Sequence, residues 1–139
     1  MQTLKLRHEV TIHALTTKLW KVLTSSEYTE QFLFDGKLVS EWMEGNPILL
    51  VEETGGHQKI TPIGEVESVV PGLQLRFRLS TLGEYYREAV TFHYELSPDD
   101  EGIRLALSQE AATTQNALSL LKEYGKMMLQ KIKWLAEYA

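Results

Sequence analysis

The sequence predicts an α+β fold, in which a curved antiparallel sheet of about seven strands grips one long C-terminal helix. Three observations carry this prediction. Residues 114–139 hold the longest single helical period in the chain, residues 37–112 form successive strand-like segments separated by turn residues, and signals for two short helices follow the first strand. Strands joined by short turns are antiparallel, and the long helix is the only element large enough to cover the apolar face of their sheet.

Length and composition limit the class of protein. A chain of 139 residues is expected to form a single domain, residues 1–139. It has no cysteine, which excludes disulfides and thiolate metal sites. The longest aliphatic run, residues 48–51, is far shorter than the ~20 residues of a membrane span, and the N-terminus alternates instead of forming a signal-peptide core. We therefore expect a soluble cytoplasmic protein without a membrane span.

The charge distribution argues against nucleic acid as a partner. Nineteen acidic and fourteen basic residues give a net charge of −5, and the basic residues are scattered. A nucleic-acid-binding surface needs clustered Lys and Arg that release counterions from the phosphates.

The first strand and the two helices follow one another closely. Residues 4–12 alternate between apolar and polar, as in a strand with one buried face. Thr16 is expected to cap the first helix, with Leu15 placed to pack against Trp20. The second helix is expected to begin at Ser25 or Ser26.

Six further strands are expected before the long helix. Their boundaries follow from Gly, Pro, Asn and Asp clusters, and the hairpin across Pro71 and Gly72 is the clearest. The expected strands span residues 37–43, 47–53, 59–70, 73–79, 88–97 and 103–112.

The long helix carries two neighbouring apolar stripes and one solvated face. The first stripe is Leu118, Leu121, Gly125, Met128, Ile132, Leu135 and Ala139. The second is Ala117, Leu120, Tyr124, Met127, Trp134 and Tyr138. Gly125 costs ~1 kcal/mol relative to Ala in a helix interior, so it marks a close backbone approach, space left open beside the helix, or a glycine without a role. Trp134 and Tyr138 either form a dimer contact or cap the core, and monomer and homodimer both stay open.

A pocket is expected between sheet and helix, because a twisted sheet and a straight helix diverge toward one end. By strand alternation its polar residues are His8, Ser68, Glu88, Tyr94 and Gln109. Its apolar wall candidates, beside Gly125, are Trp42, Phe77, Phe92, Leu121, Met127 and Met128. Plainer interpretations stand beside these: a solvated Glu88, a hydrogen-bonded core His8 and a Tyr94 that only packs.

No catalytic signature is present. The glycines and the four dispersed histidines fit no dinucleotide fingerprint, phosphate loop, nucleophile elbow or paired-histidine zinc motif. We therefore assign no catalytic residue, no metal ligand and no cofactor.

Three segments carry a resemblance to a known superfamily. Leu-Trp-Lys-Val-Leu-Thr at 19–24 precedes Glu27 and Phe32, Gly-Glu-Val-Glu-Ser-Val-Val-Pro-Gly-Leu occupies 64–73, and Val-Thr-Phe-His-Tyr-Glu-Leu at 90–96 leads into Gly-Ile-Arg-Leu at 102–105. In these the chain resembles the START-like superfamily with its helix-grip fold, and within it the branch similar to the activator of the heat-shock-chaperone ATPase. The usual Gly-Trp pair of the terminal helix is replaced by Gly125-Lys126.

The resemblance implies a pocket for an apolar molecule beneath the helix. The function we expect is binding of a hydrophobic or amphipathic small molecule without catalysis. One alternative is a co-chaperone module that stimulates a heat-shock chaperone ATPase, which would make a chaperone the partner. A second is a polyketide-cyclase-like enzyme that uses Glu88, His8 or Tyr94 as acid or base.

Overall fold

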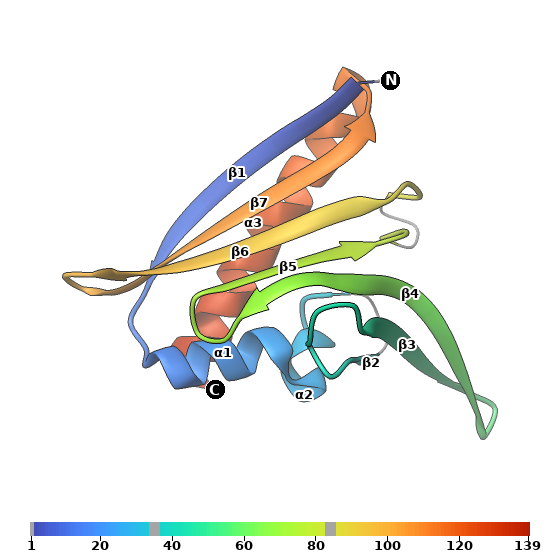
Figure 1. Ribbon diagram of the computed structural model, residues 1–139, viewed down its shortest axis with the longest axis horizontal. Helices are drawn as coiled ribbons and strands as arrows, with labels where there is room; N and C mark the ends of the chain where they lie inside the picture. Colours follow the sequence, from blue (N-terminus) through green and yellow to red (C-terminus); the bar gives the residue numbers. More distant parts are fainter. Residues whose placement is uncertain (1, 34–36, 83–85) are drawn as a thin grey trace.

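The computed structural model describes residues 2–33, 37–82 and 86–139, and it contains one sheet of seven strands (Figure 1). Every neighbouring pair is antiparallel, in the order β1-β7-β6-β5-β4-β3-β2. The strands are β1 (Gln2–Ile12), β2 (Lys37–Val39), β3 (Pro47–Thr54), β4 (His57–Val70), β5 (Gln74–Leu79), β6 (Val90–Asp99) and β7 (Gly102–Thr113). The predicted antiparallel sheet is thus confirmed.

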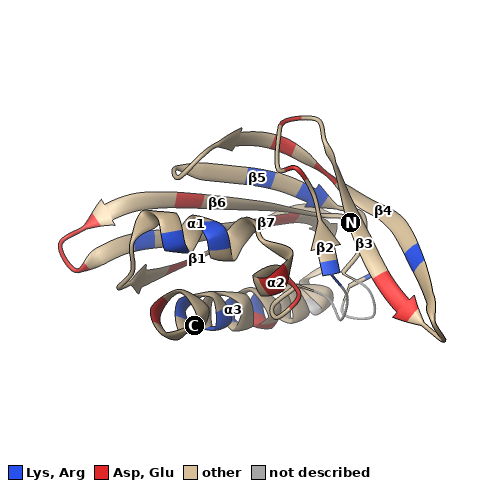
Figure 2. Ribbon diagram, turned by 90° about the horizontal axis from the view of Figure 1, so that it is seen from below, with Lys and Arg blue, Asp and Glu red and all other residues tan. Residues whose placement is uncertain are grey.

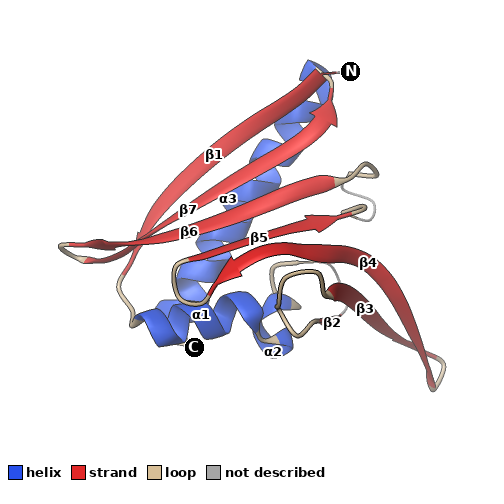
Figure 3. Cartoon of the chain, viewed as in Figure 1, coloured by secondary structure: helices blue, strands red, loops and turns tan. Residues whose placement is uncertain are grey.

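Three helices complete the fold, and the longest lies across one face of the sheet (Figure 3). They are α1 (Thr16–Thr24), α2 (Ser26–Thr29) and α3 (Gln115–Tyr138). Thr114 caps α3, because its hydroxyl accepts a hydrogen bond from the Ala117 backbone N–H at 3.3 Å. Since α3 contacts β1 and β7 while α1 and α2 lie at one end of the sheet, the α+β helix-grip architecture is confirmed.

Two local predictions were wrong. Thr16 is the first residue of α1 and not its cap; the N-cap is Leu15, which makes no side-chain capping bond and is 77% exposed, so it does not staple the helix. The strand expected over 37–43 ends at Val39. It stops early because Trp42 adopts a positive φ of 51°, which interrupts extended backbone.

The second stripe of α3 is mostly not part of the core. Tyr124 is buried, whereas four large side chains of the stripe are exposed: Leu120 (54%), Met127 (44%), Trp134 (53%) and Tyr138 (74%). The apolar side of α3 is therefore broader than the surface that the rest of the protein covers. The first stripe is mostly covered, and of the second stripe's large side chains only Tyr124 is buried.

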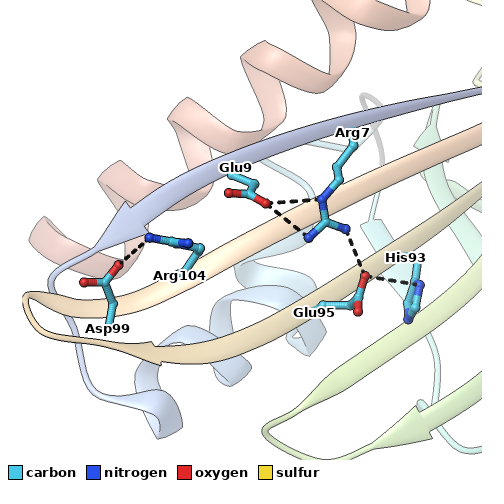
Figure 4. A network of polar contacts seen from close by, with 6 residues as sticks. All are labelled: Arg7, Glu9, His93, Glu95, Asp99 and Arg104. Atoms are coloured by element: carbon cyan, nitrogen blue, oxygen red, sulfur yellow. Dashed lines mark hydrogen bonds and ion pairs between the residues drawn. The ribbon is translucent and has the colours of Figure 1, made fainter.

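Charged residues of both signs are interspersed along the strands (Figure 2). Arg7 on β1 lies 3.1 Å from Glu9 and 3.2 Å from Glu95 on β6, and His93 lies 3.8 Å from Glu95 (Figure 4). His93 also hydrogen-bonds Gln74 at 2.8 Å. These carboxylates raise the pKa of Arg7, while burial lowers the pKa of His93. The charged outer face can stay in contact with water, so α3 covers only the inner face of the sheet.

Among the described residues, no helix has both the length and the apolarity required to cross a membrane.

Candidate functional site

An aromatic cluster fills the inner face of the sheet. Phe77 on β5 stands at its centre, with ring centroids 5.2 Å from Phe92, 5.9 Å from Tyr94 and 5.6 Å from Trp42. These contacts arise from register, because Phe77 pairs with Phe92, and both point to the side that α3 covers. Phe77, Phe92, Tyr94 and Met128 of α3 expose no surface, so side chains fill the space where an open pocket was expected. An internal pocket therefore stays a prediction.

Two buried polar atoms of this cluster lack hydrogen-bond partners, the Tyr94 hydroxyl and Trp42 Nε1, and Thr29 Oγ1 on α2 is likewise buried without a partner. A buried polar group without a partner costs about 1–3 kcal/mol. A fourth, Ser108 Oγ, belongs to the outward-facing residues of β7 because its register partners are Arg7 and His93. The inner face thus holds an unusual group of unsatisfied donors within an aromatic wall.

Burial decides the chemistry of Tyr94. Desolvation, with a smaller effect of the neighbouring Tyr124, raises the pKa of Tyr94 well above its ordinary value of 10. The Tyr94 hydroxyl therefore stays protonated and can donate a hydrogen bond. The Tyr124 hydroxyl donates to the Phe32 carbonyl oxygen at 3.4 Å, which connects this part of the cluster to the end of α2.

Trp42 forms the edge of the cluster. It is 9% exposed, whereas its neighbour Phe77 is fully covered. Its left-handed backbone conformation costs of order 1–3 kcal/mol for a residue with a side chain. The backbone N–H of Trp42 donates to Ser40 Oγ at 3.0 Å, which holds this conformation in place. Trp42 is therefore the strained member of the cluster and the one nearest to solvent.

A polar clamp holds α3 beside this cluster. Gln109 on β7 donates from Nε2 to the Leu121 carbonyl oxygen at 3.1 Å, and its Oε1 lies 3.1 Å from His8 Nε2. Since Oε1 can only accept, His8 must carry its proton on Nε2. A Cβ on Gly125 would come within 2.6 Å of His8 Nε2 and still closer to Gln109 Oε1. Gly125 is thus explained by close approach, and the space beside it is not open.

The other predicted site residues divide between the two faces. Leu121 and Met128 are buried on the sheet side of α3, as expected. Ser68 was wrongly placed: a β-bulge after Val66 pairs Ser68 with Arg76, which lies on the outer face, because the extra residue reverses the alternation. Glu88 is exposed and precedes β6, so it is not a desolvated carboxylate.

Met127 was also wrongly placed as a wall residue, since it faces away from the sheet. It lines a surface groove of about 530 Å³ on the flank of α3, next to Gln31 and Phe32. The burial of Thr29 was not predicted, because a threonine in a four-residue helix carries no sequence signal for burial.

Within the described ranges, no three His, Asp or Glu side chains come together as a metal site.

Sequence and structure comparisons place this geometry in context. Residues 13–137 match the family of activator of Hsp90 ATPase homolog 1-like proteins. Among proteins of curated function, none matches the chain by sequence. An X-ray structure of a protein from Mesorhizobium loti is similar at 20% identity with a TM-score of 0.73, over 95% of this chain and 96% of that one.

Two further structures share the fold. The Aha1 dimer from Colwellia psychrerythraea is 13% identical with a TM-score of 0.68, over 97% of each chain. The di-domain ARO/CYC protein StfQ of the steffimycin biosynthetic pathway is 15% identical with a TM-score of 0.67, over 97% of this chain and 51% of that one. At these identities the likeness concerns the fold alone. Since the family match spans nearly the whole sequence, the chain belongs to the activator of Hsp90 ATPase homolog 1-like family.

Proposed function

We propose that the protein binds a hydrophobic or amphipathic small molecule between the sheet and α3, at the aromatic cluster around Phe77. The observation that carries the proposal is the group of unpartnered polar atoms there, above all the Tyr94 hydroxyl and Trp42 Nε1. Aromatic walls with a few convergent polar groups are typical of small-molecule sites. A ligand with an acceptor atom would satisfy these two donors, and its apolar body would lie against the rings.

Entry of such a ligand requires a side chain to move, because the cluster is filled. Trp42 is the side chain suited to this role. It lies at the edge of the cluster, and its positive φ means that leaving its position relieves backbone strain. Binding then replaces part of the Trp42 ring by the ligand and offers Tyr94 an acceptor. His8, Gln109, Leu121, Gly125 and Met128 remain the rigid wall of the proposed site.

The test is native mass spectrometry of freshly purified protein, followed by denaturation to release any bound molecule. In parallel, the protein is titrated with 8-anilinonaphthalene-1-sulfonate, a probe with an aromatic body and an anionic acceptor. We expect Tyr94→Phe and Trp42→Phe to weaken probe binding at least tenfold, since each removes one donor. The matched controls Tyr138→Phe and Trp134→Phe make the same chemical changes on the surface and should leave binding unchanged.

Two outcomes would overturn the proposal. The first is a wild-type protein that carries no bound mass and does not bind the probe. The second is binding that all four variants retain equally, which would put the ligand elsewhere.

A co-chaperone activity is the second candidate, and the family description favours it. It predicts that the protein raises the ATP hydrolysis rate of a heat-shock chaperone of the Hsp90 class. An unchanged hydrolysis rate at saturating protein would exclude it. Cyclase-like acid–base chemistry has less support, because Glu88 is exposed and His8 Nε2 is engaged by Gln109.

A further inference from the structure

The outward-facing stripe of α3 has the spacing of a helix-pairing surface. Leu120, Met127 and Trp134 follow one another at intervals of seven residues, and each exposes about half of its side chain. A seven-residue repeat of large apolar side chains is the pattern along which two helices pair. Trp134 also contacts Tyr138, with ring centroids 6.3 Å apart, which extends the apolar surface toward the end of the helix.

The groove beside this stripe has the composition of a coiled-coil hole. Its α3 residues are Met127, Gln130, Lys131 and Trp134, at positions i, i+3, i+4 and i+7, and Phe32 closes one side. In paired helices, four residues at this spacing form the hole that receives one side chain of the facing helix. The groove is about 530 Å³ in volume, which is ample for one large aliphatic side chain.

We propose that this surface is the interface of a homodimer in which the α3 helices of two copies pack antiparallel. The stripe supplies both parts of the contact. Leu120 of the partner subunit enters the groove between Met127 and Trp134, and the two-fold axis places this chain's Leu120 in the partner's groove. In such an isologous contact the same surface supplies both the protruding side chain and the groove that receives it. An unrelated partner would need a separate surface that provides both.

Polar residues along one edge of the stripe fit the same arrangement. In this arrangement, Leu120 of one copy lies beside residues 130 and 131 of the other along the helix pair. The two-fold axis of the dimer then crosses α3 about level with Gly125. Glu123 then lies about level with Met127 of the partner subunit, at the edge of the contact. Lys131, for which the described residues provide no ion-pair partner, lies over the partner's Leu120 with its aliphatic stem.

The size of the surface sets the strength of the dimer. A helix of 24 residues is ~36 Å long, so one helix pair buries less than the ~800 Å² per partner of a standard interface. We therefore expect a weak, reversible dimer. The residues that line the groove are separate from those of the aromatic cluster, so the dimer does not depend on the proposed ligand.

Sedimentation equilibrium over a wide concentration range tests the interface. The weight-average mass of the wild type should rise from the 15.9 kDa of one chain toward twice that value. Met127→Glu and Leu120→Glu should weaken dimerisation at least tenfold. Leu73→Glu, which changes an equally exposed leucine at the β4–β5 turn, should dimerise like the wild type. A wild type that stays monomeric, or a dimer that Met127→Glu and Leu120→Glu leave unchanged, would overturn the proposal.

The direction of pairing can be tested separately, because the chain has no native cysteine. Met127→Cys lies close to the two-fold axis, so two copies should be joined by a short bismaleimide. Two copies of Tyr138→Cys lie more than about 30 Å apart in the antiparallel dimer and should not be joined. Joining of both variants would indicate a parallel dimer and contradict the arrangement.

Discussion

Replacing Gly125 by Ala should destabilise the protein, although the same change stabilises most helices. The new Cβ would lie 2.6 Å from His8 Nε2 and closer still to Gln109 Oε1. Both side chains are flexible at their ends, but Gln109 is only 1% exposed and cannot turn toward water. Its displacement breaks its hydrogen bonds to His8 and to the Leu121 carbonyl oxygen.

The magnitude follows from two opposing effects. Leaving the buried amide of Gln109 unsatisfied costs about 1–3 kcal/mol for each lost partner. Ala is better than Gly in a helix interior by about 1 kcal/mol. We therefore expect Gly125→Ala to lower the free energy of unfolding by about 1–5 kcal/mol, since two lost partners cost about 2–6 kcal/mol and the helix gain offsets about 1 kcal/mol.

Urea denaturation followed by circular dichroism measures this change. The decisive comparison uses the Gln109→Ala background, where the clamp is absent and His8 has room to move. There the same glycine substitution should be neutral or stabilising by up to about 1 kcal/mol. The difference between the two backgrounds is the coupling energy of the pair. A Gly125→Ala variant as stable as wild type, or an equal loss in both backgrounds, would refute the explanation of Gly125 by close approach.

Three further predictions concern other contacts. Thr114→Ala should lower the free energy of unfolding by about 1 kcal/mol through loss of the α3 cap, while Thr114→Ser should retain the hydrogen bond to Ala117 and most of the stability. Glu137 accepts hydrogen bonds from the His13 backbone N–H and from Lys133, each at 2.8 Å, and these lower its pKa below the ordinary 4.5. A lowered folded pKa contributes stability above pH 4.5 that is lost as the pH falls below it, so Glu137→Gln should reduce the dependence of the urea midpoint on pH in the acid range; an unchanged dependence would contradict this. Arg7→Ala should shift the urea midpoint only slightly, because the ion pairs of Arg7 with Glu9 and Glu95 are half exposed, and the shift should shrink as salt is added.

Strand alternation predicted the inner face well where strands are regular. His8, Phe92 and Gln109 lie on β1, β6 and β7, which pair without interruption, so each residue points where its parity requires. Ser68 follows a bulge that no local pattern marks, and one extra residue was enough to turn it outward.

The role of Gly125 and the exposure of Met127 depend on contacts between distant parts of the chain. Gly125 meets His8 and Gln109, which are 117 and 16 residues away (125 − 8 and 125 − 109). Met127 is as apolar as its neighbour Met128, and the two differ only in which side of α3 the sheet reaches. Helical periodicity identifies apolar positions, but it does not tell how wide a surface the sheet offers them.

The anchoring of α3 has a consequence for how the molecule can change shape. Besides the clamp at Gly125, polar bonds tether the C-terminal end of the helix to the end of β1 and to α1. Lys133 Nζ donates to the Thr11 carbonyl oxygen of β1 at 2.7 Å, and Lys18 Nζ of α1 donates to the Ala139 carbonyl oxygen at 2.6 Å. A helix fixed at two points along its axis can neither slide nor rotate without breaking directional bonds. We therefore expect α3 to stay fixed when the molecule opens. The movement should come from the part of the structure that holds Trp42.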